Sequence, residues 1–296
     1  MTFFFFKLIM KNIHILRVED FDFSHAKLIA RGGFAEVKKV KRKMNDTFYA
    51  VKFFFDSMHN FSMNKEGTLP LEAEILSQLD YPTIVKFYGI IEMDNKIGIV
   101  SEFIPNGSFR DYIEHDVDRP EWNITNKYIS ILGISLSMRY LHSKNIVHRN
   151  LKPMNVVFDS NFYPKISSLS LARKYSPNVE PDENVGTLFY SAPEIMQCQE
   201  NCDGKKADVF SFGMTMYSII YDYPPTRSNS IEFNNEIGSE FINKLIRNCI
   251  HEDTKKRPNF DEITILLLNG RDKFPQSENI DEKKVNVFLE YCNIAP

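Results

Sequence analysis

The chain has 296 residues, a length that fits one large domain or two modest ones. Hydrophobic residues make up 43% of it and charged residues 25%, so there is enough apolar surface for a packed core, and disorder as the main state is excluded. Its 36 basic and 39 acidic side chains leave a net charge of −3, which argues against sequence-independent binding to nucleic acid.

The chain begins with a phenylalanine-rich stretch over residues 1–11. Lys7 interrupts this stretch and no small-residue cleavage site follows, so we expect a leader or an element that packs on the domain rather than a signal peptide. No stretch is long enough to predict a membrane span. The cysteines lack the spacing of a zinc site and predict free thiols in a reducing, cytoplasmic compartment: Cys198, Cys202, Cys249 and Cys292.

The first third of the chain carries strand signals. Residues 23–30, 36–43 and 47–55 are β-rich, with turn residues at Gly32-Gly33 and Asn45-Asp46. Three such runs joined by short turns predict an antiparallel meander.

A helix is expected next, because Leu71, Ile75 and Leu79 recur every four residues. Pro70 suits its first turn and Thr68 is a candidate cap. Two further strands are expected over residues 84–92 and 96–103.

After the turn at Pro105-Asn106-Gly107 the apolar spacing becomes helical, so this turn is the expected hinge between two lobes. Helices are predicted over residues 124–141, 207–221, 240–250 and 260–268. A β-rich front and a helical rear predict an α+β fold.

Two motifs in the β-rich part carry chemistry. Residues 29–37 read IARGGFAEV, and a glycine in such a loop lets backbone N–H groups approach a phosphate closely. Lys52, in the apolar run YAVK, needs a partner because lysine is rarely buried alone. The helix predicted to follow offers two carboxylates, Glu72 and Glu74, which would face opposite sides of it.

The strongest motif is HRNLKPMN over residues 148–155, followed by KISSLSLAR over 165–173. Residues 186–194 read GTLFYSAPE, residues 208–213 read DVFSFG, and Arg257-Pro258 follows. In this order and spacing the motifs resemble the eukaryotic protein kinases, whose glycine-rich loop, strand lysine and catalytic loop they match. Lys152-Pro153 and Thr187 favour the serine/threonine or tyrosine-kinase-like branches.

The resemblance covers roughly residues 21–270 and implies the two-lobed kinase fold. Its small N-terminal lobe would span about 21–103 and its larger helical lobe about 107–270. Residues 1–20 would then be an N-terminal extension and 271–296 a C-terminal tail.

The resemblance also implies an ATP site. Lys52, held by Glu72, would bind the phosphates, while Val37, Ala50 and Val157 would enclose the adenine. Asn155 would bind a second metal ion. The other residues implied at this site are Ala30, Gly32, Ala35, Glu102 and Phe103. A regulatory column through the core would comprise Leu76, Phe87, His148 and Leu169, and Glu194, Asp208 and Arg257 would be structural anchors.

The sequence departs from the family's pattern at the reacting groups. Asn150 stands where the family places the base that accepts the substrate proton, and an amide cannot act as that base near neutral pH. Ser168 stands at the position of the metal-binding aspartate, and a hydroxyl is a poor ligand for Mg²⁺. Ser170 replaces the glycine of the same motif, and Ala30 and Ala35 replace two loop glycines.

A second departure is a shortened segment. Residues 226–239 show little apolar periodicity where the family carries a helix that often docks partners, so altered docking or a trimmed loop is expected.

The resemblance and its departures predict a catalytically impaired kinase homologue, or pseudokinase, that acts as a switch or scaffold for protein partners in signalling. It would bind ATP weakly, with little need for Mg²⁺. The alternatives are an active Ser/Thr kinase that retains Lys152 and uses a relocated acid such as Asp159, and a nucleotide sensor. Phosphorylation of Tyr175, Ser176 or Thr187 stays open, with Arg149 as the residue that would receive the phosphate.

Overall fold

The computed structural model describes residues 13–33, 35–55, 70–94, 96–113, 121–175, 187–197, 202–225 and 231–295. They fall into two compact units. The sheet unit comprises residues up to 80 together with 85–104, and the helical unit comprises residues 81–84 and those from 105 onward. The long stretch of the helical unit therefore begins at Pro105, the first residue of the expected hinge turn.

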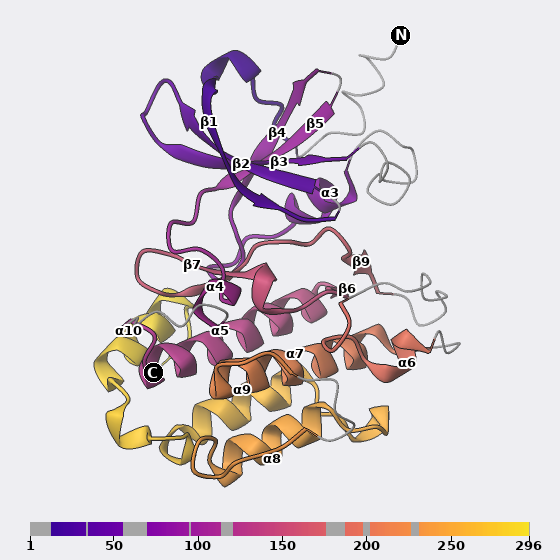
Figure 1. Ribbon diagram of the computed structural model, residues 1–296, viewed down its shortest axis with the longest axis vertical. Helices are drawn as coiled ribbons and strands as arrows, with labels where there is room; N and C mark the ends of the chain where they lie inside the picture. The colour runs from indigo at the N-terminus through magenta and orange to yellow at the C-terminus, as the bar shows by residue number, and fades with distance from the viewer. Residues whose placement is uncertain are drawn as a thin grey trace. The chain divides into compact units, whose positions relative to one another are not determined.

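The sheet unit is built on five antiparallel strands in the order β1-β2-β3-β5-β4 (Figure 1). This confirms the predicted meander and the two later strands. The strands span β1 Phe21–Arg31, β2 Ala35–Arg42, β3 Phe48–Phe54, β4 Phe87–Met93 and β5 Lys96–Glu102, with a short 3₁₀ turn, η1 Val18–Asp20, before the first.

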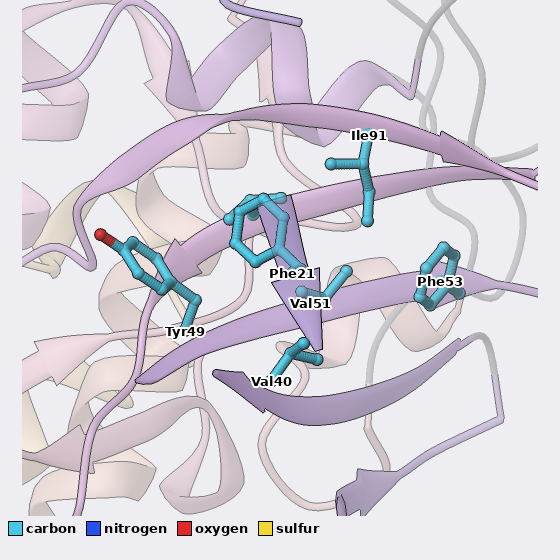
Figure 2. Close-up of a cluster of buried hydrophobic side chains, with 7 residues drawn as sticks. Phe21, Val40, Tyr49, Val51, Phe53 and Ile91 are labelled. Carbon is cyan, nitrogen blue, oxygen red and sulfur yellow. The ribbon is translucent and has the colours of Figure 1, made fainter. Parts of the chain in front are cut away.

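The core of this unit lies on one face of the sheet. Directly paired residues share a face, so the pairs Val40–Tyr49 and Val51–Val100 place their side chains together. Figure 2 shows Phe21 and Phe53 on the same side, and the Phe21 and Tyr49 rings meet edge to face at 5.7 Å. The full buried cluster is Phe21, Val40, Tyr49, Val51, Phe53, Ile91 and Val100.

The helix of the sheet unit, α3 Leu71–Leu76, is shorter than the apolar spacing predicts. It ends before Ser77, and the chain turns at residues 77 and 78, so Leu79 lies beyond it. Pro70 is the residue before the helix rather than part of its first turn, and its carbonyl accepts from the Ala73 N–H at 2.9 Å. The proposed cap at Thr68 lies outside the described residues.

The strand expected from residue 84 starts later. Ile84 bridges to Ile166 in the helical unit, and β4 begins at Phe87. The edge of β4 is instead extended by residues 14–16, since the Ile90 N–H donates to the His14 carbonyl at 2.9 Å and Leu16 donates to the Ile90 carbonyl at 2.8 Å. Gly89, with φ +145°, permits this approach, because a Cβ there would lie 2.2 Å from the His14 oxygen.

The helical unit is organised around α5 Ile124–Ser143, which packs against α7 Gly204–Tyr221 and α9 Phe260–Asn269 (Figure 1). α8 Glu240–Cys249 packs against α7. All four helices were expected, and each starts at a polar cap such as Asn123, whose side chain accepts from the Asn126 N–H. Between Pro225 and α8, the described residues 231–239 form no helix, as the weak periodicity of that segment predicts.

Several short elements complete this unit and were not predicted. The strands pair as β6 with β9 and β7 with β8. Their bounds and those of the short helices are α4 Arg110–Ile113, β6 Ile146–Val147, η3 Pro153–Asn155, β7 Val156–Phe158, β8 Pro164–Ile166, β9 Arg173–Lys174, α6 Pro193–Met196 and η4 Thr254–Lys256.

The expected C-terminal tail is folded onto the helical unit. Residues 271–295 form η5 Arg271–Lys273, η6 Ser277–Asn279 and α10 Glu282–Tyr291, which packs on α5. Phe288 is fully buried and its ring lies 4.9 Å from that of Tyr163. A Cβ on Gly133 would come within 2.9 Å of Phe288, so this glycine lets the two helices approach.

In the described residues, none of the helices combines the length and apolar character needed to cross a membrane. Among the described residues, Cys249 and Cys292 are buried thiols, and Cys202 Sγ donates to the Glu194 carbonyl at 3.6 Å, while Cys198 lies outside the described residues. Burial raises the pKa of the Cys292 thiol to about 12 and also raises that of Cys249.

Phe288→Ala should destabilise the helical unit by roughly 3–5 kcal/mol, because it opens a cavity at a fully buried aromatic site. Val287→Ala on the same helix, where Val287 is 49% exposed, should change stability by no more than about 0.5 kcal/mol. Urea unfolding followed by circular dichroism measures both. Equal midpoints for the two variants would mean that α10 adds little to the stability of the unit.

Candidate functional site

In the sheet unit, expected nucleotide-binding residues lie on the face of the sheet opposite the buried core. Val37 pairs with Lys52 and Lys39 with Ala50, so these side chains project to the same side of β2 and β3. Ala30 pairs with Val37 on β1. This register brings together four of the residues expected around a nucleotide in the sheet unit: Ala30, Val37, Ala50 and Lys52.

The loop between β1 and β2 is closed by a hydrogen bond from the Gly32 N–H to the Ala35 carbonyl at 2.9 Å. A Cβ on Gly32 or Gly33 would meet nothing within 4 Å, so both glycines leave open space above the loop. Ala35 is buried at 7% exposure and Ala30 is exposed. Among the described residues of this loop, Gly32 and Gly33 thus leave the backbone open to a close approach.

Lys52 and Glu72 form the expected ion pair. Lys52 Nζ lies 2.7 Å from Glu72 Oε2, and the Glu72 side chain is only 2% exposed. Because the Glu72 carboxylate is buried, it needs the lysine as a counter-charge, and removing either partner would leave the other charge uncompensated. The pair fixes the lysine ammonium on the same face as Val37 and Ala50.

The residues at the end of β5 are engaged within the sheet unit. Glu102 Oε1 accepts from the Lys86 N–H at 2.8 Å. The Phe103 ring lies 6.3 Å from that of Phe48, and Lys39 Nζ sits 4.3 Å from the centroid of Phe103. Lys39 therefore adds a cation to this face that sequence reasoning did not single out, although the alternation of β2 could have revealed it.

In the helical unit, Asp208 of α7 holds the loop that carries Asn150. Its carboxylate is 1% exposed and accepts from the backbone N–H groups of His148 and Arg149, each at 2.8 Å. His142 Nε2 lies 2.9 Å from the same carboxylate. Arg149 adopts φ +67°, a left-handed conformation that is costly for a side-chain-bearing residue. These hydrogen bonds stabilise that conformation.

Asn150 and Lys152 are joined through Thr187. Lys152 Nζ donates to Thr187 Oγ1 at 2.6 Å, and Thr187 Oγ1 donates to Asn150 Oδ1 at 3.0 Å. Because the threonine proton goes to Oδ1, the other end of the Asn150 amide is an N–H donor. The side chain at the expected position of the catalytic base is therefore held in one orientation, but it presents an N–H donor where a base needs an acceptor.

Burial lowers the pKa of Lys152, and the positive charge of Arg110 lowers it further. Among the described residues, no Asp or Glu pairs with Lys152. The ammonium thus sits half-buried with a neutral hydroxyl as its partner.

The remaining expected site residues lie close by in sequence. Asn155 is 8% exposed, and its Nδ2 donates to the Asn150 carbonyl at 2.7 Å, which orients the amide within the loop. Ser168 Oγ lies 3.3 Å from Ser170 Oγ. Val157, on β7, pairs with Lys165.

The side chains of Asn155 and Ser168 are weak ligands for a divalent cation. Mg²⁺ prefers carboxylate oxygens, and here an amide and a hydroxyl stand in their place. Within the described ranges, no group of three or more His, Cys, Asp or Glu side chains is placed to hold a metal ion. The role that the resemblance implies for Asn155 at a metal therefore stays a prediction, with its Oδ1 as the only atom of the side chain that could act as a ligand.

The expected column residues are described within their own units. Leu76 is 3% exposed in the sheet unit, and His148 and Leu169 are 0% and 1% exposed in the helical unit. Phe87 is partly exposed. Burial of three of the four matches the core role that the resemblance implies.

The anchor expected from Glu194 and Arg257 is present and buried. Arg257 Nη1 and Nη2 donate to the two carboxylate oxygens of Glu194 at 2.6 and 3.0 Å. Arg257 Nε donates to the His251 carbonyl at 2.8 Å, which satisfies a further donor. This bidentate pair ties α6 to the start of α9.

Sequence reasoning missed two partners in this unit. Thr187 was noted as a branch marker and phosphorylation candidate, not as the link between Lys152 and Asn150. His142 was not singled out at all. Both contacts join residues that are distant in sequence, 35 and 66 positions apart, so only the fold could reveal them.

Comparison with known proteins agrees with this geometry. The sequence model of the family described as "Protein kinase domain" matches residues 23–266. The mouse dual specificity testis-specific protein kinase 2 is 30% identical over 283 residues, covering 89% of this chain and 47% of that protein. The mouse 3-phosphoinositide-dependent protein kinase 1 is 28% identical over 257 residues, covering 85% of this chain and 43% of that protein. The chain thus spans less than half the length of each of these two relatives.

Glu194→Gln should destabilise the helical unit by about 3–5 kcal/mol, because it leaves the Arg257 guanidinium buried without a counter-charge. Glu252→Gln, at an exposed position, is the control and should leave stability within about 0.5 kcal/mol. Urea unfolding midpoints measure the difference. A loss below about 1 kcal/mol for Glu194→Gln would show that the pair is not a structural anchor.

Proposed function

The chain belongs to the protein kinase family, and on that basis we propose that it is a catalytically impaired member, a pseudokinase, that acts as a switch or scaffold for protein partners. One observation carries the proposal. The loop that should supply the base is held in an ordered geometry, while the two acidic positions of the reaction carry Asn150 and Ser168.

The state of Asn150 supports a loss of proton transfer. Thr187 donates to Asn150 Oδ1, so the amide nitrogen is the group left for a ligand, and it can only donate. A substrate hydroxyl would be oriented there without losing its proton. The contribution of a general base, roughly 10²–10⁴-fold in rate, would be lost.

The metal positions support a second loss. Phosphoryl transfer depends on neutralising the charge that develops on the transferred group, a task that the family assigns largely to metal ions held by carboxylates. Ser168 offers a neutral hydroxyl, and Asn155 offers only the neutral Oδ1 of an amide whose Nδ2 donates to the Asn150 carbonyl. Both groups are neutral and are poorer ligands for Mg²⁺ than carboxylates, so the neutralisation of phosphate charge by the metal would be weakened.

Weak ATP binding remains consistent with the residues of the sheet unit. Val37 and Ala50 provide apolar surface for the adenine ring, and Lys52, held by Glu72, provides a positive charge for the phosphates. The exposed methyl group of Ala30 replaces a glycine of the covering loop and would reduce how closely its backbone approaches phosphate. We therefore propose low affinity and little dependence on Mg²⁺.

The alternative is an active Ser/Thr kinase with noncanonical residues. The observation that favours it is the intact link from Lys152 through Thr187 to position 150, which would orient a substrate hydroxyl. Asp159, the acid considered for a relocated role, is used in a turn, where its Oδ1 accepts from the Asn161 N–H at 2.8 Å and the Tyr163 N–H at 3.0 Å. We rank this alternative second for that reason.

With ATP, Mg²⁺ and generic protein substrates, the purified chain should transfer phosphate at the background rate. Asn150→Asp alone should not restore transfer, because Ser168 still leaves the metal unheld. Only Asn150→Asp combined with Ser168→Asp, with Ser170→Gly added, has the required groups. A radiolabel assay measures this, and robust transfer by the unmodified chain that Lys52→Ala abolishes would establish the active-kinase alternative.

In thermal-shift titrations, ATP should stabilise the chain only slightly, and equally with and without Mg²⁺ or Mn²⁺. Lys52→Ala should weaken ATP more than adenosine, because the lysine contacts only phosphate. Adenosine is the control for binding of the adenine ring, because it carries no phosphate. A stabilisation by ATP that rises strongly with Mg²⁺ would contradict the proposed loss of metal binding.

A further inference from the structure

Lys152 is a half-buried cation in an unusual environment. Its ammonium donates to the neutral Thr187 hydroxyl at 2.6 Å, and Arg110 lies near enough to act on it as a second positive charge. Half-buried cations normally meet a carboxylate, because burial removes the water that would otherwise stabilise the charge. Among the described residues, this one meets none.

Other cations of the chain illustrate the usual arrangement. Lys52 pairs with a carboxylate at 2.7 Å, and Arg257 makes two hydrogen bonds to another. Position 150 is where a carboxylate could have served Lys152, since the two side chains are linked through one hydroxyl group. Asn150 makes that position neutral.

The groups around Lys152 are arranged to donate. Thr187 gives its proton to Asn150 Oδ1, and the described residues offer no acceptor to Asn150 Nδ2. Lys152 Nζ carries three protons, of which Thr187 takes one. The two side chains therefore leave several N–H donors with a net positive charge and no anion.

We propose that Lys152 and the Asn150 amide form a binding site for a phosphate monoester dianion, carried on a phosphorylated serine or threonine side chain of a partner protein. The inference rests on the proposed loss of catalysis and deepens it by naming what the degenerate loop binds. The dianion completes the charge balance of Lys152 and accepts from both side chains. Charge-assisted hydrogen bonds of this kind are the strong ones in proteins.

A phosphate group can bind at this loop because position 150 carries an amide in place of a carboxylate. A carboxylate there would repel a phosphorylated side chain, which suits an enzyme that must release its product. An amide of the same shape removes the repulsion and supplies a donor. A phosphorylated side chain thus becomes a ligand of this loop rather than a departing product.

The test is isothermal titration calorimetry with a phosphoserine peptide, its unphosphorylated form, inorganic phosphate and ATP. The phosphoserine peptide should bind the intact chain and the unphosphorylated peptide should not. Lys152→Met should weaken binding about ten- to hundredfold. Asn150→Asp, which adds one negative charge at nearly constant shape, should weaken it by about tenfold or more. Lys255→Met removes an exposed lysine of the same unit and should leave affinity unchanged.

Circular dichroism establishes that each variant is folded, and Asn150→Asp keeps the test valid if Lys152→Met does not fold. Equal binding of the two peptides, or unchanged affinity in folded Asn150→Asp and Lys152→Met, would overturn the inference. Binding of ATP or inorganic phosphate that depends on Lys152, with none of the phosphopeptide, would also overturn it. A failed peptide experiment with background-level phosphate transfer would leave the proposed function standing, whereas robust transfer would refute that function by itself.

Discussion

The Asp208 carboxylate is the constraint on which the functional half of the helical unit depends. It is buried on α7 and accepts the backbone N–H groups of His148 and Arg149, while His142 from α5 contacts the same group. Backbone donors can satisfy a buried carboxylate only if the loop follows one path. That path includes the left-handed Arg149, and it delivers Asn150 and Lys152 to Thr187.

The order of strands and long helices followed from the sequence, because apolar periodicity and kinase-like motifs agreed there. Local signals failed where tertiary contacts overrode them. Leu79 continues a helical spacing, yet the chain turns after Leu76, and Ile84 leaves the sheet to pair with Ile166. α10 was treated as a tail because it lies beyond the matched motifs, although Phe288 is fully buried. The motifs located Lys52, Glu72 and Asn150, whereas the hydrogen-bond chain through Thr187 needed the fold.

Under the proposed function, the chain separates two properties that an active kinase combines. Positioning depends on the buried pairs Lys52–Glu72 and Arg257–Glu194 together with the Asp208 hydrogen bonds, and all of these are in place. Chemistry depends on negative charge at two positions, where this chain carries an amide and a hydroxyl. Because buried pairs are costly to break and surface-facing acids are not, the scaffold can persist when the acids change. The outcome is an ordered loop whose local charge has become more positive.

The contact between Gly89 and His14 also bears on how the chain avoids joining other sheets. A strand at the rim of a sheet offers unpaired N–H and carbonyl groups to any other extended chain. At β4 those groups are partly occupied by residues 14–16, an arrangement that the absent side chain of Gly89 permits. At the opposite rim, β1 breaks its register twice along β2 and carries Lys27, features that discourage a straight partner strand. A bulkier residue at position 89 would push residues 14–16 away from β4. The hydrogen-bonding groups of that edge strand would then be exposed, and the chain would tend to self-associate.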